Sequence, residues 1–267
     1  SDISMTDSMA CADVILPAAT HLEYGDLYAA YGHHYLQRSA PVVAPQGEAL
    51  PNTELFRRLA QCFGFDEPCF RETDQELMDQ AFAAGCEGLE GMRPSELPLH
   101  RAMDMSAGRP RGVLRGAPPA TPSGKIELYS QRLEDESGQG LPRFRELHSD
   151  RRFILVSPAS EHRINSTFGG LADHDRDLCC EIHPADAASL ALEQTALVRL
   201  FNDQGEVVLP LVVTDRVRRG TVYVPKGAWL GQSPTGQTIN ALIPGHKADL
   251  AGGACYYDCT VDVEACP

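Results

Sequence analysis

The second half of the chain is a succession of short apolar runs, and this pattern constrains the fold more than any other feature of the sequence. The runs are rich in Val and Leu, as strands are, and they occupy residues 153–157, 196–202, 206–214 and 220–225. A turn sequence at 202–205 (Asn-Asp-Gln-Gly) joins two of them as a hairpin. One short helix, opened by a proline, interrupts the series. Short strands, a tight hairpin and one helix predict a small closed β-barrel.

The first part of the chain has a different, mixed texture. Residues 13–17 (Asp-Val-Ile-Leu-Pro) predict a buried strand that ends at the proline. A helix is expected to begin at Asn52 and to end at Gly64. Its apolar residues recur four apart, as one face of a helix requires: Leu55, Leu59 and Phe63. A strand followed by an amphipathic helix indicates an α/β segment.

A second helix is predicted just after the first. Thr73 and Glu76 have the spacing of a capping box, in which each side chain accepts from the backbone N–H of the other residue. We expect this helix to end before Gly85 and to bury three apolar residues: Leu77, Ala81 and Phe82.

Residues 91–125 lose this periodicity and form a proline-rich stretch that is locally basic. Two interpretations stay open. The stretch is either a solvated crossover, or a flap that lies over an anionic ligand or partner.

Length and composition limit the classes of function. At 267 residues the chain is long enough for two domains. Its net charge of −14 opposes general binding to nucleic acid, which rewards Lys and Arg. The longest apolar stretch, Val207–Val213, is too short to span a bilayer. Nine cysteines, an odd number in a chain of this size, predict reduced thiols. We expect the cytoplasm, with the periplasm left open because any export signal would lie upstream of Ser1.

Searches for familiar catalytic motifs fail. Residues 231–236 (Gly-Gln-Ser-Pro-Thr-Gly) have one residue too many for a nucleophile elbow, and residues 122–125 lack the glycine and hydroxyl of a phosphate loop. Cys255, Cys259 and Cys266 do not have the spacing of a zinc ribbon. We therefore expect no metal ligand here and take these cysteines as core or surface residues.

The loop at residues 157–170 concentrates polar side chains directly after a predicted strand. It carries hydroxyls, an amide, an imidazole and a guanidinium. Such a set of donors suits phosphate or pterin oxygens. The same residue types also cap their own turns, so a purely structural role stays open from the residues alone.

Several stretches, taken in order, resemble the catalytic subunits of molybdopterin oxidoreductases. Residues 4–17 resemble a stretch of that family that reads Thr-x-(Ser or Thr)-x-x-x-Ala-Asp-Val-x-Leu-Pro. Residues 121–128 (Thr-Pro-Ser-Gly-Lys-Ile-Glu-Leu) are similar to a second stretch of the same subunits. The remaining matches resemble the family's C-terminal dinucleotide-binding domain, and they lie at residues 183–187, 202–205, 214–215, 220–222 and 240–242.

The resemblance implies a fold, a cofactor and a set of cofactor-binding residues. Residues 1–135 would be the end of the α/β portion, with the long loop at 91–125, and residues 150–267 would form a double-psi β-barrel of the aspartate-decarboxylase type. The family carries molybdenum or tungsten on two molybdopterin guanine dinucleotides and transfers oxygen atoms or electron pairs. Carried over by motif, the cofactor-binding residues would be His162, Asn165, Ser166, Thr167, Asn240 and Asp249.

The resemblance also implies that much of the enzyme lies elsewhere. The family's metal-ligating residue and any iron–sulfur cysteines align upstream of Ser1, so no catalytic residue is assigned. We expect a fragment, inactive alone, whose partners are the N-terminal domains and electron-transfer subunits. Residues 25–34 depart from the Gly-Thr-x-Thr-Asn pattern of the formate and nitrate branches, which puts those substrates in doubt without selecting another.

Two other classes of function are considered. The barrel could be an interaction or assembly module that has lost cofactor binding. It could also be a stand-alone decarboxylase of the same architecture, but self-processing decarboxylases need a Gly-Ser step that this sequence lacks.

Overall fold

The structure is a computed structural model that describes residues 1–83, 87–89, 91–106, 118–144, 146, 149–167, 169, 178–192, 196–233 and 235–266. The chain divides into two compact units. Unit 1 comprises Ser1–Met5 and Ala12–Leu128, and unit 2 comprises Thr6–Cys11 and Tyr129–Pro267. Each unit is described by itself. No helix in the described part of the chain is long and apolar enough to cross a membrane.

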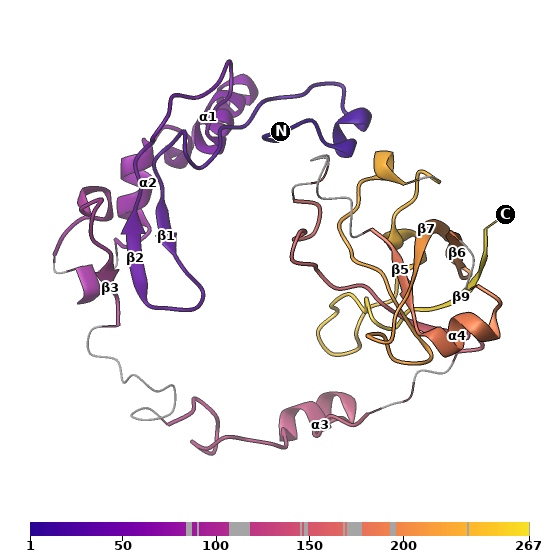
Figure 1. Cartoon of the computed structure of the whole chain (residues 1–267). Helices are drawn as coiled ribbons and strands as arrows, with labels where there is room; N and C mark the ends of the chain where they lie inside the picture. The colour runs from indigo at the N-terminus through magenta and orange to yellow at the C-terminus, as the bar shows by residue number, and fades with distance from the viewer. Residues whose placement is uncertain are drawn as a thin grey trace. The chain divides into compact units, whose positions relative to one another are not determined.

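Unit 2 contains a closed barrel of six strands (Figure 1). The strands are β4 (Phe153–Val156), β5 (Cys180–Ile182), β6 (Leu197–Phe201), β7 (Glu206–Val213), β8 (Thr221–Tyr223) and β9 (Thr260–Ala265). Around the barrel they follow the order β4-β8-β5-β7-β6-β9. The pairs β4–β8 and β5–β7 are parallel and the other pairs are antiparallel. The predicted closed barrel is confirmed.

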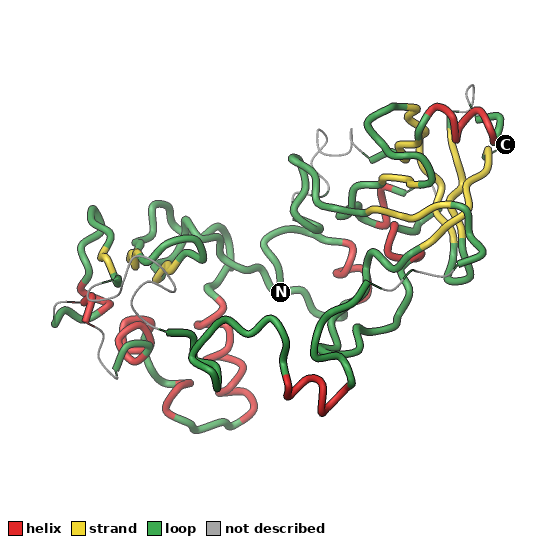
Figure 2. Tube along the Cα trace, turned by 90° about the horizontal axis from the view of Figure 1, so that it is seen from below, coloured by secondary structure: helices red, strands yellow, loops and turns green. Residues whose placement is uncertain are grey.

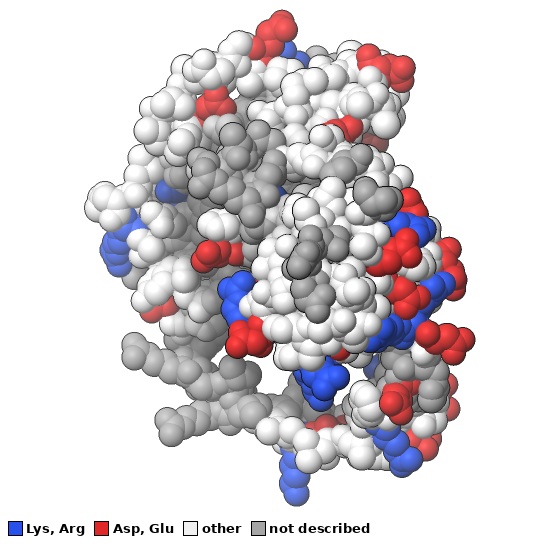
Figure 3. All heavy atoms as spheres, turned by 45° about the vertical axis from the view of Figure 1, so that its right-hand side comes forward, with Lys and Arg blue, Asp and Glu red and all other residues white. Residues whose placement is uncertain are grey.

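Alternating side chains fill the barrel. Phe153 and Leu155 of β4 are buried, whereas Ile154 between them is exposed, as the two faces of a strand require. The same alternation along β6 buries Val198 and Leu200. Outside the barrel, Arg199 lies between Glu206 of β7 and Glu264 of β9, at 2.7 and 2.6 Å. Figure 3 shows acidic and basic side chains intermingled on the face that it displays.

The turn and the helix of the barrel form as the sequence predicts. In the hairpin, the backbone N–H of Asn202 donates to Gly205 O at 3.1 Å. Helix α4 (Pro184–Ser189) has Pro184 in its first turn and His183 as its N-cap. Asp186 on α4 accepts from the backbone N–H of Gly220 at 2.8 Å, which ties the helix to the start of β8. Strands β5 and β9 were absent from the sequence prediction.

Unit 2 also contains helical elements outside the barrel strands. Helix α3 (Gln131–Ser137) begins after Ser130, whose hydroxyl accepts from the backbone N–H of Leu133, and ends at Gly138 in the left-handed conformation. Three short 3-10 helices complete the unit: Asp7–Cys11, Leu230–Gln232 and Ile239–Leu242.

Unit 1 is mainly helix and loop (Figure 2). Its three-stranded antiparallel sheet is small, with β1 (Leu27–Ala29), β2 (Tyr35–Arg38) and β3 (Met103–Asp104) in that order. Helices α1 (Asn52–Phe63) and α2 (Asp74–Gln80) follow the sheet's first two strands in the chain. Three 3-10 helices lie at Pro68–Phe70, Glu87–Leu89 and Pro94–Glu96. A small cluster of buried residues forms its core: Leu36, Leu89, Leu97 and Met103.

The two predicted helices of unit 1 are confirmed, but they bury less of their apolar residues than predicted. Helix α1 ends at Gly64, which has φ 74°. Phe63, expected on its buried face, is 71% exposed. Helix α2 has the predicted capping box between Thr73 and Glu76. It ends at Gln80, so Ala81, expected on its buried face, lies beyond the helix and is exposed, and Leu77 and Phe82 are only half-buried. The predicted stop at Gly85 lies outside the described residues.

Two other expectations for unit 1 need correction. The predicted buried strand at residues 13–17 is wrong: the segment has no strand, and Val14 is 71% exposed. Apolar character alone cannot form a strand, because a strand also needs a neighbour with which to pair. Within the stretch 91–125, Leu97 and Met103 are buried and β3 pairs with β2, so its first part belongs to the core and is not a solvated crossover. Residues 107–117 lie outside the described part.

Candidate functional site

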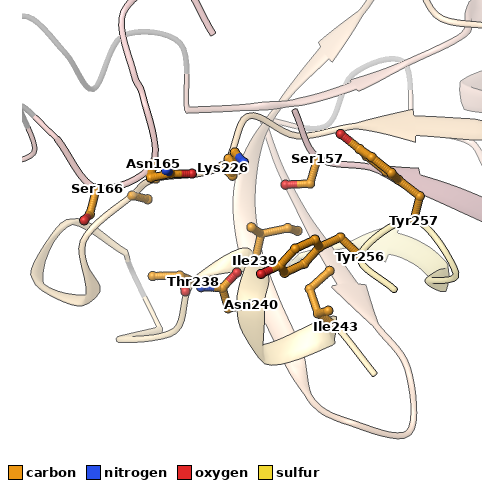
Figure 4. A pocket seen from close by; sticks show the side chains of 12 residues that line it. Ser157, Asn165, Ser166, Lys226, Thr238, Ile239, Asn240, Ile243, Tyr256 and Tyr257 are labelled. Atoms are coloured by element: carbon orange, nitrogen blue, oxygen red, sulfur yellow. The ribbon is translucent and has the colours of Figure 1, made fainter. Parts of the chain in front are cut away.

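A pocket of about 440 Å³ opens at one end of the barrel in unit 2 (Figure 4). Strands β4 and β8 are parallel neighbours, so the segments that follow them leave the barrel at the same end. The pocket forms where these two segments meet the 3-10 helix Ile239–Leu242 and the turn before β9. Its lining residues are Ser157, Asn165, Ser166, Lys226, Gly227, Ala228, Thr238, Ile239, Asn240, Ile243, Tyr256 and Tyr257.

Ser157 follows β4 directly and carries a buried hydroxyl on the pocket wall. The residue is 7% exposed, and its Oγ has no hydrogen-bond partner in the part of the chain that the structure describes. Leaving a hydroxyl buried without a partner costs about 1–3 kcal/mol. A polar ligand in the pocket would remove that cost, so Ser157 indicates a ligand here.

Asn165 and Gly227 fit together so closely that they fix the shape of the loop. Asn165 has φ 53°, a left-handed conformation that Asn tolerates better than most residues. Gly227 has φ 101°, and a Cβ there would lie 1.7 Å from Asn165 O. Because only glycine combines this backbone conformation with this close approach, the segment after β8 is shaped to hold the loop after β4.

Trp229 holds the same loop from a second point. Its Nε1 donates to Ser166 O at 2.9 Å, and a Cβ on Gly169 would overlap the indole ring. In addition, Lys226 N donates to Pro158 O at 3.0 Å. The polar loop is therefore fixed by backbone and indole contacts, which leaves the side chain of Ser166 on the pocket wall.

The chemical character of the pocket is that of a site for a polar, anionic ligand with a ring system. Lys226 supplies a positive charge, and Asn165, Thr238 and Asn240 supply amide and hydroxyl groups. The rings of Tyr256 and Tyr257, each more than half exposed, lie on another side of the same space (Figure 4). Fixed donors beside a cation suit a phosphate, and an aromatic face suits a planar heterocycle.

Three of the six residues predicted from sequence line this pocket, and three do not. Asn165, Ser166 and Asn240 come together there from two segments that lie far apart in the chain. His162 is half exposed and lies 3.4 Å from the Glu161 carboxylate.

The other two predicted residues also lie away from the lining. Thr167 donates its backbone N–H to Ile164 O at 3.1 Å, within the turn of the loop. Asp249 accepts from Gln139 Nε2 at 2.9 Å.

Sequence reasoning missed several residues of the lining. Lys226 is the one that the sequence could most readily have indicated, because it is one of only three lysines and directly follows a predicted strand. Thr238, Tyr256 and Tyr257 gave no such signal. Thr238 reaches the pocket because η6 (Ile239–Leu242), which it precedes, is anchored in the barrel core by the buried Ile239 and Leu242. Tyr256 and Tyr257 reach it from the turn before β9.

Two family models match the chain. The model of the molydopterin dinucleotide binding domain matches residues 153–260, and the model of molybdopterin oxidoreductase matches residues 1–62. Together they cover more than half of the chain, in the order that the sequence motifs predicted. The chain belongs to the molybdopterin oxidoreductases. The double-psi barrel that this family implies fits the closed six-stranded barrel of unit 2.

The curated relatives match nearly all of this chain, but the chain covers less than half of their own length. The chain is 33% identical over 271 residues to the probable oxidoreductase YoaE of Bacillus subtilis, covering 98% of this chain and 39% of that protein. It is 29% identical over 303 residues to the dimethyl sulfoxide reductase DmsA of Escherichia coli, covering 98% and 37%. The chain thus spans about two fifths of the relatives that it matches.

A solved structure has a similar fold. The acetylene hydratase of Pelobacter acetylenicus superposes with a TM-score of 0.72 at 23% identity, covering 94% of this chain and 38% of that chain. At this identity the likeness concerns the fold. The pocket and the matched dinucleotide-binding domain fall on the same barrel, and the buried Ser157 hydroxyl and the Lys226 cation have the chemistry that a dinucleotide requires.

Proposed function

We propose that this chain supplies part of the cofactor site of a molybdenum or tungsten oxidoreductase that carries two molybdopterin guanine dinucleotides. The observation that carries the proposal is the pocket at the end of β4 and β8, where the buried hydroxyl of Ser157 has no hydrogen-bond partner among the described residues and Lys226 supplies a cation. When bound, the cofactor supplies a metal that exchanges oxygen atoms or electron pairs with a substrate. This chain's residues bind and orient its nucleotide end.

Lys226 and the hydroxyls of the pocket suit the pyrophosphate. The pyrophosphate is an anion, and a buried anion needs fixed donors and a counter-charge. Ser157, Ser166 and Lys226 all line the pocket, so the two hydroxyls can donate to the phosphate oxygens of a ligand beside the lysine. Asn165 and Asn240 offer amides that can both donate and accept, as a pterin or guanine edge requires.

Three of the residues predicted to bind the cofactor do not line the pocket, and we propose cofactor contacts for them as well. His162, Thr167 and Asp249 would contact the cofactor from further along the same loops. We propose that residues 1–135 complete the α/β portion and that residues 150–267 form the dinucleotide-binding barrel. The metal ligand, any iron–sulfur cluster and the electron-transfer partners would belong to the remainder of the enzyme, for which we propose the cytoplasm.

The experiment measures cofactor per folded enzyme in the holoenzyme that contains this chain. Guanosine monophosphate released by acid, and molybdenum or tungsten, are counted per chain for the unchanged protein, Ser157→Ala and Lys226→Gln. A hydrogen bond to a charged group is worth about 1.5–3 kcal/mol, so each change should lower occupancy about tenfold or more under limiting cofactor. Ser157→Ala should leave the stability of the apoprotein unchanged or raised, because it removes a buried hydroxyl that has no partner there.

Matched controls use the same residue types outside the lining. Lys247→Gln and Thr235→Ala remove a lysine and a threonine hydroxyl from unit 2 and should leave occupancy unchanged, whereas Thr238→Ala should lower it. Ser166→Ala with Thr167→Ala tests the polar loop. Normal cofactor content in Ser157→Ala and Lys226→Gln would refute the proposed site. If the purified enzyme without any substitution contained no dinucleotide, the barrel would be an interaction module instead.

The partial length of the chain and the names of its relatives lead to two further expectations. The 267-residue chain alone should hold no stoichiometric molybdenum and should have no redox activity, because the chain spans about two fifths of its relatives. One molybdenum or tungsten per chain in elemental analysis would contradict this. For the whole enzyme we propose an S-oxide or N-oxide substrate, since relatives include a dimethyl sulfoxide reductase and a trimethylamine-N-oxide reductase. Reduction of either oxide by the holoenzyme, with a dye as electron donor, is the assay.

A further inference from the structure

A loop of unit 2 brings together three side chains of different metal-binding chemistry. One ligand atom each from His246, Cys255 and Asp258 lies within 4.8 Å of the others. The imidazole and the carboxylate are about half exposed, so a cation could reach them from solvent. Of the three cysteines whose sequence spacing argued against a zinc ribbon, the cluster uses Cys255 alone, and its other two ligands are not cysteines.

The backbone, and not the side chains alone, creates this cluster. Lys247 and Ala254 form an antiparallel bridge, and Ala248 N donates to Gly253 O at 2.8 Å. In an antiparallel pair the residues flanking one bridge face each other, so His246 and Cys255 stand opposite at the base of the loop. A turn in which Asp258 N donates to Cys255 O at 3.2 Å then brings the carboxylate back over the thiol.

The distances suit a small tetrahedral cation. His246 Nε2 and Asp258 Oδ2 are 3.3 Å apart. Nitrogen and oxygen ligands bind Zn²⁺ at about 2.0 Å, and two such ligands at a tetrahedral angle lie about 3.3 Å apart. The Cys255 sulfur lies within 4.8 Å of both atoms, so it would supply the third ligand, and a water would take the fourth position.

The charge around the thiol also favours a cation. Burial and the neighbouring carboxylates of Asp258 and Asp249 raise the pKa of the Cys255 thiol. A dication reverses this effect, because it stabilises the thiolate and neutralises the carboxylates together. A sulfur, a nitrogen and an oxygen ligand select Zn²⁺ over Mg²⁺ or Ca²⁺, which prefer oxygen alone.

The other cysteines of this segment have a different environment. Cys259 is 1% exposed and its thiol donates to Leu242 O at 3.0 Å, in the barrel core. Burial raises the pKa of Cys259 to about 11, with no carboxylate among the causes. Cys266 lies beyond β9, where its backbone N–H donates to Leu197 O. Cys266 is therefore a matched control for Cys255 on the same unit.

We infer that His246, Cys255 and Asp258 form a binding site for one Zn²⁺ ion, which closes the loop 246–258 at its base. On binding, the Cys255 thiol loses its proton to solvent and its sulfur bonds to the metal. Tyr256 and Tyr257 lie between two of the ligands in the sequence, so the ion would also hold the pocket wall that they form. This inference stands independently of the proposed dinucleotide site.

The test uses the reduced, metal-stripped 267-residue chain and two metals. Co²⁺ is added first, because cobalt bound to a thiolate shows a sulfur-to-metal charge-transfer absorption. Zn²⁺ is then titrated in competition with a chromophoric chelator to obtain stoichiometry and affinity. We expect one Zn²⁺ per chain and a thiolate band in the Co²⁺ form. Loss of an outer-sphere partner already weakens metal sites about 10–100-fold, so Cys255→Ser, His246→Ala and Asp258→Asn should each weaken Zn²⁺ binding at least about tenfold.

Two controls distinguish a built site from adventitious binding. Cys266→Ser and Cys11→Ser should keep the affinity and the cobalt band of the unchanged chain. Far-ultraviolet circular dichroism and the fluorescence of Trp229 check that each variant folds, and the three ligand changes at exposed or half-buried positions serve as independent tests. No stoichiometric Zn²⁺, or equal loss in Cys266→Ser and Cys255→Ser, would overturn the inference. Either result leaves the dinucleotide site untouched, because that site is measured by guanosine monophosphate content.

Discussion

The two units of this chain are held together in different ways. In the barrel, six strands close on themselves, so every strand has two neighbours, and one continuous cluster of buried residues fills the interior. Unit 1 has only a small open sheet and a cluster of four buried residues among those described. It relies more on local hydrogen bonds between side chains and the backbone, such as those of the capping box of α2 and of the Glu23 carboxylate. We therefore expect core packing to dominate the stability of the barrel. In unit 1 we expect local hydrogen bonds to make the larger contribution.

The sharpest test removes a core side chain from each unit. Leu200→Ala opens a cavity in the barrel, where Leu200 is fully buried in a closed structure that cannot collapse around it. It should lower the free energy of unfolding by about 3–5 kcal/mol. Leu97→Ala in unit 1 should cost about 2–3 kcal/mol, because the smaller, open cluster can relax into the space.

Two probes report the units separately in urea or thermal unfolding. Trp229 is the only tryptophan of the sequence and lies in unit 2, so its fluorescence follows the barrel. Far-ultraviolet circular dichroism weighs the helices of unit 1 more heavily. A larger loss from Leu97→Ala than from Leu200→Ala would break the comparison.

The second test concerns the polar loop of the barrel. Gly227→Ala places a Cβ against Asn165 O and adds strain at φ 101°, so we expect a loss of about 2–4 kcal/mol together with displacement of the pocket loop. Gly236→Ala is the matched control: Gly236 also has a positive φ, 66°, but nothing lies within 4 Å of the added carbon. It should cost only about 1 kcal/mol. Equal melting temperatures for the two variants would show that the contact with Asn165 does not hold the loop.

The third test weakens a local device in unit 1. Thr73→Ala removes the hydroxyl that accepts from the backbone N–H of Glu76 and donates to its carboxylate, and should destabilise unit 1 by about 1 kcal/mol. Ser130→Ala at α3 removes a single, longer hydrogen bond of 3.3 Å and should cost about 0.5 kcal/mol. The dichroism transition should shift in Thr73→Ala while the Trp229 transition stays in place. A shift of the Trp229 transition alone would contradict the assignment of this device to unit 1.

The smallest expected effect is a pH dependence of unit 1. Glu23 accepts from the backbone N–H groups of Thr20 and Gln46, at 2.6 and 2.8 Å, and these bonds hold its pKa below the usual value. A carboxyl group with a lowered folded pKa contributes stability that is fully present above its unfolded pKa, about 4.3. That contribution is lost as the pH falls through the lower folded pKa. Glu23→Gln should flatten the dependence below that pH in the dichroism transition, and an unchanged acid profile would contradict the role of Glu23.

Local signals in the sequence predicted the elements that depend on neighbouring residues. The capping box of Thr73 and Glu76, the stop of α1 at Gly64 and the hairpin at 202–205 all follow from short-range hydrogen bonds, and they form where they were predicted. The strand at residues 13–17 fails for the complementary reason. Its apolar residues carry the pattern of a strand, but pairing is a long-range property that the pattern does not contain.

The sequence by itself determined the family, the barrel and a polar loop with cofactor chemistry, because ordered motifs and alternating apolar residues survive without any knowledge of contacts. Only the tertiary structure decided which residues meet. The parallel pairing of β4 with β8 brought Lys226 beside Ser157, and the packing of η6 added Thr238 and Asn240. A bridge between Lys247 and Ala254 set His246 against Cys255. Residues far apart in the chain become neighbours through strand register and loop closure, and neither is written in the spacing of the residues themselves.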